Sequence, residues 1–131
     1  MPDIAHEVHD LIMRLPCRVE LPLDYGTFFE ATGPLPPHLE DSRQVPRFYC
    51  RTFAALTVRS SLPGMPREES TERVCLKDIS RSGVSLLHSR QLFPAERLEL
   101  VVLDGIRREL RVTRCRKIQD RCYEIGAALV V

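Results

Sequence analysis

The chain has 131 residues, of which 44% are hydrophobic and 28% are charged, and its formal net charge at pH 7 is +1. This length is enough for one sizeable hydrophobic core and short for two, so we expect a single folded domain. The near-neutral charge argues against a nucleic-acid polymer as partner, because proteins that bind nucleic acids generally carry a strongly basic surface.

The N-terminal residues are expected to form an amphipathic helix that starts after Asp3 and ends before Pro16. Apolar residues recur there at three- and four-residue spacings, which place them on one helix face. They are Ile4, Val8, Leu11, Ile12 and Leu15. This face requires a cover, and two alternatives are open. Either it packs on the rest of the same chain, which we favour, or it contacts a second copy or a partner protein.

Residues 17–45 are expected to be an irregular connecting segment, because prolines interrupt every regular pattern in it. From residue 52 onward, short runs rich in β-forming residues alternate with turn signals. They predict six antiparallel strands at 52–60, 73–79, 83–88, 97–103, 106–116 and 122–131. Asp104-Gly105 between two apolar runs predicts a two-residue hairpin turn. The fold class is therefore all-β with a terminal helix: an N-terminal part, 1–45, and a small six-stranded barrel or sandwich, 46–131.

Two arginines four residues apart, Arg47 and Arg51, form an R-x-x-x-R motif directly after Pro46. In an extended segment these side chains project from one face, roughly 13 Å apart at about 3.3 Å per residue. Arginine suits an anion site, because its guanidinium can bind phosphate oxygens or the O6 and N7 edge of guanine in a bidentate manner. The alternative for the pair in isolation is solvated surface.

A second motif, D-x-S-x-x-G, comprises Asp78, Ser80 and Gly83. Asp78 and Ser80 are two residues apart and are expected on one face of a strand, with Asp78 accepting N–H groups and Ser80 donating to an oxygen. Gly83 permits a tight turn or a close approach of the backbone to a ligand. The alternative is an ordinary turn, in which all three residue types are common.

The two motifs in this order, followed by the predicted strands, resemble the PilZ domain family over roughly residues 46–131. The resemblance implies a β-barrel that binds the bacterial second messenger cyclic di-GMP without catalysis, through Arg47, Arg51, Asp78, Ser80 and Gly83. It also implies that the arginine arm, lying before the first strand, becomes ordered on the ligand and changes the surface that a protein partner meets. The alternative is a PilZ-like interaction module that does not bind the nucleotide.

Two features depart from the family's pattern. A helix commonly follows the last strand and covers one barrel mouth, whereas here the strand pattern runs to Val131, so we expect the N-terminal helix to close the barrel instead. In the family an additional arginine directly before R-x-x-x-R accompanies a stacked pair of ligands, and that position is Pro46 here. Arg43, Arg114 and Arg116 are further cations that would neutralise the phosphates of two ligands, so we lean toward a dimeric ligand. Simple exposure of Arg114 and Arg116 is the equal alternative.

The sequence indicates no other chemistry. Its four histidines lack metal-site spacing, and no nucleophile motif or phosphate-binding loop is present, so we expect no metal, no cofactor and no enzymatic activity. The five cysteines are odd in number and widely spaced, which favours reduced thiols. No signal-peptide core is visible and no stretch approaches the roughly 18 apolar residues of a membrane span, so we expect a cytoplasmic protein.

Overall fold

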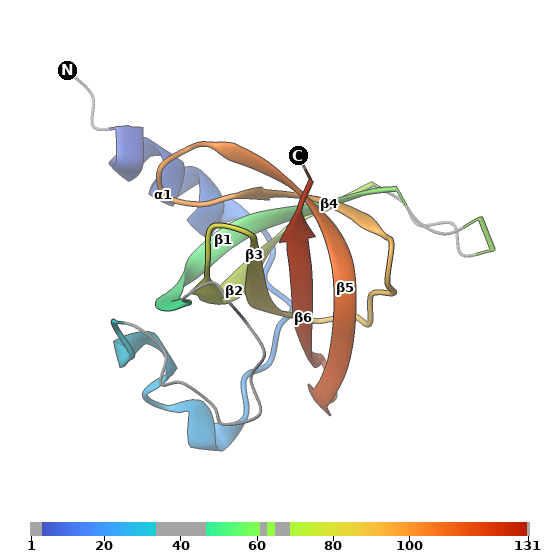
Figure 1. Ribbon diagram of the computed structural model, residues 1–131. Coiled ribbons are helices and arrows are strands. Elements are labelled where there is room, and N and C mark those ends of the chain that lie inside the picture. Colours follow the sequence, from blue (N-terminus) through green and yellow to red (C-terminus); the bar gives the residue numbers. More distant parts are fainter. Residues whose placement is uncertain (1–3, 34–46, 61–62, 65–68, 131) are drawn as a thin grey trace.

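The computed structural model describes residues 4–33, 47–60, 63–64 and 69–130, and Figure 1 shows their arrangement. The helical elements of this part are α1 (Ile4–Arg14) and the short 3-10 helices η1 (Leu23–Tyr25) and η2 (Phe28–Glu30). The strands are β1 (Phe48–Ser60), β2 (Thr71–Ile79), β3 (Gly83–His88), β4 (Arg97–Val101), β5 (Arg107–Gln119) and β6 (Cys122–Leu129). Asp3, Arg43 and Pro46, which carry expectations from the sequence, lie outside the described residues.

The six strands form a closed antiparallel barrel in the order β1-β2-β3-β6-β5-β4. The predicted six-stranded antiparallel barrel is confirmed, and a two-sheet sandwich is wrong. Side chains that alternate along each strand fill the interior, as a small barrel requires. The largest buried members of this core are aliphatic, including Leu56, Leu76, Leu86, Leu98, Leu100, Leu110 and Ile125.

The first strand begins earlier than the sequence predicts. Phe48 and Tyr49 already pair with the last residues of β2, Ile79 and Asp78. The extra pairing exists because β2 runs to Ile79 and offers backbone partners to the residues that precede position 52. Arg51 consequently lies inside β1, and the expectation of an arm that precedes the first strand is wrong for this residue.

The connection between β4 and β5 is longer than expected. The last pair of these strands joins Val101 to Arg107, so residues 102–106 form the loop, and the predicted two-residue hairpin at Asp104-Gly105 is wrong. Gly105 has a φ of +76° in this loop, a conformation that favours glycine. Among the other strands, β2 begins before position 73 and β5 extends to Gln119.

Irregularities in strand pairing decide which side chains face outward near one end of the barrel. Between β2 and β3, Leu76 pairs with Leu86, yet the next pair joins Asp78 to Ser85. Strict alternation would direct Asp78 inward with Leu76, whereas the extra residue, Lys77, shifts the pattern by one. Asp78 therefore lies beside Ser85 on the outer face of the barrel.

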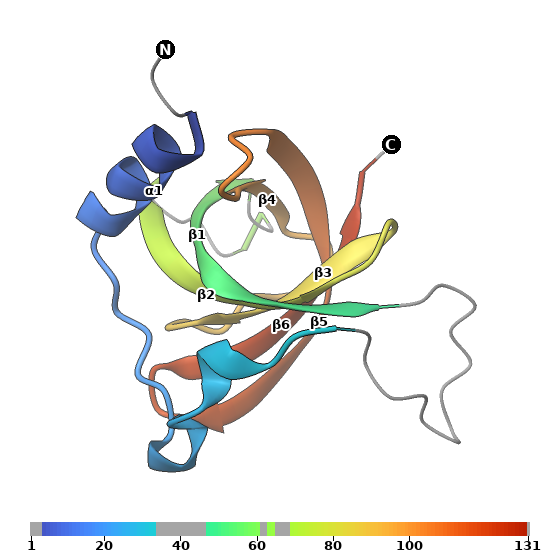
Figure 2. The same cartoon turned by 90° about the vertical axis from the view of Figure 1, so that its left-hand side faces the viewer.

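The helix α1 packs on the outside of the barrel, beside β1 and β2, as Figure 2 shows. Ile12 is buried, whereas Leu11 is 61% exposed and Val8 and Leu15 are partly buried. The backbone N–H of Arg73 donates to Pro16 O at 2.8 Å, which ties the end of the helix to β2. The helix thus packs on its own chain through Ile12, while Leu11 is exposed. Because Ile12 lies outside the core cluster of the barrel, the expectation that the helix closes the barrel is wrong.

The segment after α1 covers part of the outer barrel surface. Phe28 of η2 is buried there in a second apolar cluster with Cys75, Leu87 and Cys122 of β2, β3 and β6. All five cysteines of the chain are free thiols. No helix in the described part of the chain is long and apolar enough to cross a membrane.

Candidate functional site

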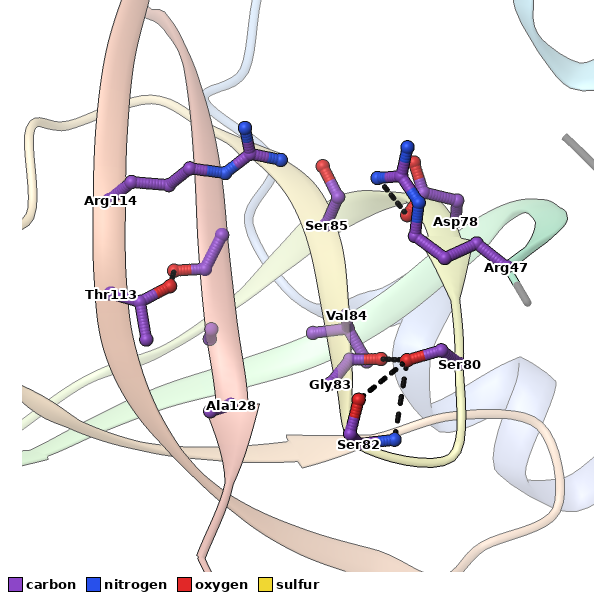
Figure 3. Close-up of a pocket in the computed structure, with 12 residues that line it drawn as sticks. Arg47, Asp78, Ser80, Ser82, Gly83, Val84, Ser85, Thr113, Arg114 and Ala128 are labelled. Carbon is purple, nitrogen blue, oxygen red and sulfur yellow. Dashed lines mark hydrogen bonds and ion pairs between the residues drawn. The ribbon is translucent and has the colours of Figure 1, made fainter. Parts of the chain in front are cut away.

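A cavity of about 380 Å³ lies on the outer face of the barrel, over β2, β3, β6 and β5 (Figure 3). It is lined by residues from both predicted motifs and from the late strands. Its lining comprises Arg47, Asp78, Ser80, Ser82, Gly83, Val84, Ser85, Thr113, Arg114, Gly126, Ala127 and Ala128. Arg47, Asp78, Ser80, Gly83 and Arg114, which the sequence proposed as site residues, are thus brought together.

The register of four strands creates this site. Asp78 pairs with Ser85, Ser85 pairs with Gly126, and Gly126 pairs with Arg114, so these residues form one cross-strand row. Neighbouring strands lie about 4.8 Å apart, so the row spans three such intervals. An acid stands at one end of the row and a base at the other, with small residues between them.

Arg47 and Asp78 form one wall of the cavity. Their Nη1 and Oδ1 atoms are 3.5 Å apart, and their side chains are 23% and 3% exposed. Burial raises the pKa of the Asp78 carboxyl, and the charges of Arg47, Lys77 and Arg114 oppose that effect only in part. Beside Asp78, the Ser85 hydroxyl is buried and forms no hydrogen bond with any described residue. A ligand that donates hydrogen bonds to the Asp78 carboxylate and accepts one from the Ser85 hydroxyl would therefore stabilise both groups of this wall.

Arg114 forms the opposite wall and reaches across β6. A Cβ atom placed on Gly126 would stand 2.6 Å from Arg114 Nε and 2.7 Å from its Cγ, so the missing side chain of Gly126 makes the path of Arg114 possible. Figure 3 shows the Arg114 guanidinium directed over Gly126's strand toward Ser85. Arg114 makes no hydrogen bond or ion pair with another described residue, so the donors of its guanidinium can bind an acceptor in the cavity.

Ser80 and Gly83 shape the turn between β2 and β3. Because β2 ends at Ile79, Ser80 lies in the turn, and its expected place on a strand face beside Asp78 is wrong. The Ser80 hydroxyl accepts from the N–H of Ser82 at 3.2 Å and donates to Gly83 O at 3.4 Å. Gly83 is required by a close approach: a Cβ atom on it would overlap Ala127 O of β6. That contact involves the neighbouring strand, and Gly83 does not have a positive φ.

Arg51 is not in this cavity. Its guanidinium lies 4.2 Å from the centre of the Phe28 ring and 4.9 Å from that of Tyr49, and its Nη1 donates to Phe28 O at 3.4 Å. It lines a separate cavity of about 270 Å³ together with Lys77. The register shift of β1 against β2 between Tyr49 and Thr52 includes Arg51. The two arginines of the R-x-x-x-R motif therefore line different cavities in this structure.

Arg116 is also directed elsewhere. Its Nη2 donates to Glu124 Oε2 at 2.8 Å, and Lys77 Nζ lies 3.2 Å from the same oxygen. Burial alone would raise the pKa of Glu124, but the hydrogen bonds and charges of Arg116 and Lys77 outweigh it and lower the pKa. Of the additional arginines that the sequence suggested, only Arg114 is observed in the cavity, since Arg43 lies outside the described residues.

Sequence reasoning missed Ser85 and Gly126. A glycine inside the last predicted strand was a visible signal, because glycine within a strand often marks a close approach. Its partner was not visible, since the pairing of Gly126 with Arg114 depends on a register shift between β5 and β6.

Comparisons with known proteins do not identify a family: no family model matches the chain, and no curated protein matches it. The ligand and the activity are therefore inferred from the residues of the cavity and their geometry.

Proposed function

We propose that this protein is a PilZ-like, non-catalytic bacterial receptor for cyclic di-GMP that acts in the cytoplasm and relays ligand binding to a protein partner. The observation that carries the proposal is the cross-strand row at the cavity, with Arg47 and Arg114 on opposite sides of small residues. Cyclic di-GMP has two phosphodiesters and two guanines, and each is a target for a guanidinium.

The walls of the cavity match the ligand's groups by charge. Arg114 lines the cavity without a hydrogen bond or ion pair to another described residue, and it would bind a phosphate or stack on a guanine. Asp78 would accept from guanine N–H groups, and such hydrogen bonds stabilise the ionised carboxylate whose burial otherwise disfavours it. Arg47 is 3.5 Å from Asp78, a long ion pair that leaves most of its donors for the ligand.

The cavity favours one ligand. Its volume of about 380 Å³ is near the lower end of the roughly 300–1,000 Å³ typical of small-molecule sites. Arg116, one of the cations that suggested a ligand dimer, is engaged with Glu124 at 2.8 Å. We therefore propose a single cyclic di-GMP per protein, in place of the dimer toward which the sequence leaned.

Arg51 supplies the connection between the ligand and the surface. To reach a nucleotide in the cavity it would leave the Phe28 ring, and its departure would loosen η2 from β1. A partner protein would then bind to, or dissociate from, the changed surface of the segment around Phe28 and Phe29. This step depends on the position of Arg51 within β1 and does not require an arm ahead of the strand.

A second candidate is a PilZ-like interaction module that binds no nucleotide. The specific observation in its favour is that the motif side chains already have internal partners: Arg47 is paired with Asp78, Ser80 bonds within its own turn, and Arg51 lies on Phe28. Arg114 argues against this candidate. Its side chain passes over Gly126 and directs a guanidinium into the cavity, and a module that only contacts proteins does not require this arrangement.

Calorimetric titration with cyclic di-GMP tests the proposal. Arg47→Gln and Arg114→Gln should each weaken binding about ten- to a hundredfold, since each removes a charge-assisted contact. Arg107→Gln is the matched control, because Arg107 lies on the same strand as Arg114 but pairs with Glu99 outside the cavity. The absence of heat with the unaltered protein, or unchanged affinity in both test variants, would refute the receptor function and favour the interaction module.

A further inference from the structure

A third cavity, of about 550 Å³, lies where the segment after α1 crosses the barrel. This segment is visible in Figure 2 as the stretch that descends from α1 toward η1. Glu20 holds it to the β5–β6 turn, because its N–H donates to Arg121 O at 2.9 Å and its carbonyl accepts from Gln119 at 3.0 Å. The cavity is thus bounded by chain segments that these hydrogen bonds hold together.

The lining of this cavity is rich in cationic donors. It comprises Cys17, Arg18, Val19, Glu20, Ser89, Arg90 and Arg121. Arg121 is paired with Glu20 at 2.8 Å, which leaves Arg18 and Arg90 without a carboxylate in the lining itself. Arg18 reaches the buried Glu72 beneath the segment at 3.4 Å, a contact through one of its two terminal nitrogens. The buried Nε of Arg90 has no hydrogen-bond partner in the described part of the chain.

Ser89 gives an independent indication of a ligand. It directly follows β3, is 8% exposed, and lines the cavity, while its buried hydroxyl has no hydrogen-bond partner in the described part of the chain. A buried hydroxyl without a partner is unfavourable, and a bound acceptor removes that cost. Ser89 and Arg90 are adjacent, so both donors stand at one place on the wall.

We propose that this cavity binds a small molecule through a phosphate or carboxylate group. Guanidinium groups and a hydroxyl are the donors that such oxyanions prefer. The volume of about 550 Å³ is within the roughly 300–1,000 Å³ of small-molecule sites, so the ligand is metabolite-sized and larger than a bare anion. This site shares no lining residue with the cross-strand row, and the proposal does not depend on cyclic di-GMP binding.

Ligand binding at this site would fasten the segment after α1 to the barrel. Arg18 belongs to that segment, Arg90 lies just after β3, and Arg121 lies in the β5–β6 turn. A ligand that contacts all three arginines binds only when the segment after α1 is packed on the barrel, and it stabilises that packing by mass action. The bound anion therefore links the position of α1 to the concentration of a metabolite.

The test is a two-dimensional ¹H–¹⁵N NMR titration of the full chain with three separate probes: inorganic phosphate, AMP and malonate. We expect saturable shifts of the amides of Cys17, Ser89, Arg90 and Arg121 with at least one probe. Saturation by AMP and phosphate identifies a phosphate site, and saturation by malonate alone identifies a carboxylate site. Both results support an oxyanion site.

Variants locate the binding. Arg90→Gln should weaken the saturating probe about tenfold or more, and Ser89→Ala should weaken it severalfold, while Arg107→Gln should leave its affinity unchanged. Thermal unfolding of the ligand-free variants establishes that each is folded. The proposal is overturned by linear, non-saturating shifts with all three probes, by shifts confined to the Arg47 and Arg114 cavity, or by Arg90→Gln that binds with wild-type affinity.

Discussion

Two glycines of neighbouring strands make opposite predictions when alanine replaces them. A Cβ atom on Gly126 meets the Cγ, Cδ and Nε atoms along the flexible, exposed side chain of Arg114. A Cβ atom on Gly83 meets the carbonyl oxygen of Ala127, which is held by the pairing of β3 and β6. The first substitution therefore displaces a side chain, and the second displaces backbone.

The magnitudes differ accordingly. Gly126→Ala gains roughly 0.5–1 kcal/mol, because alanine loses less chain entropy on folding than glycine within a strand. Moving the Arg114 side chain offsets this gain, so the net change in the free energy of unfolding should stay within about 1 kcal/mol. Gly83→Ala should cost about 1–3 kcal/mol, the range for an overpacked site that cannot yield.

The two variants should separate again in ligand binding. Gly126→Ala moves the Arg114 guanidinium from the cavity, so cyclic di-GMP should bind about ten- to a hundredfold more weakly while stability is preserved. Urea denaturation gives the free energies of unfolding, and calorimetry gives the affinities. The geometry is refuted if Gly126→Ala destabilises the protein as much as Gly83→Ala does. The role of Arg114 is refuted if Gly126→Ala binds the ligand as the unaltered protein does.

Three further predictions concern other parts of the structure. Phe28→Leu keeps an apolar side chain but removes the ring beneath Arg51, so Arg51 is released without the loss of a cation–π contact of about 0.5–2 kcal/mol. Calorimetry should therefore show that cyclic di-GMP binds about two- to thirtyfold more tightly. Phe29→Leu is the control, and equal effects of both substitutions would contradict the release of Arg51 from Phe28. Burial raises the pKa of Asp78 in the folded protein above 3.8, the value of an unburied carboxyl. The stability that comes from the protonated carboxyl is therefore fully present below pH 3.8 and is lost as the pH rises through the pKa of the folded state. Asp78→Asn should therefore gain stability relative to the unaltered protein as the pH increases above 3.8 in a urea denaturation series, and a constant difference would disprove this. Burial raises the pKa of Cys75 to about 12, so iodoacetamide at about pH 8 should label it only in urea, and rapid labelling of the folded protein, detected by mass spectrometry, would contradict its burial.

The sequence alone determined the barrel and part of the site. Strands with one face buried alternate apolar and polar residues locally, so each of the six strands could be placed over most of its observed length and the antiparallel barrel could be expected. The two motifs also identified Arg47, Asp78, Ser80 and Gly83, which line one cavity. Turn lengths were less accessible: the β4–β5 loop spans residues 102–106, because the end of strand pairing and not the Asp-Gly pair sets its length.

Only the tertiary structure decided how those residues are arranged. A shift of one residue in strand pairing transfers a side chain to the opposite face, and such shifts place Asp78 beside Ser85 and Arg114 beside Gly126. The separation of Arg51 from Arg47 also depends on residues distant in sequence. The pairing of β1 with β2 is irregular around Arg51, and the Phe28 ring that it contacts comes from the segment after α1. Register, bulges and packing of the N-terminal segment depend on partners distant in sequence, and local residue patterns carry no information about which of them will meet.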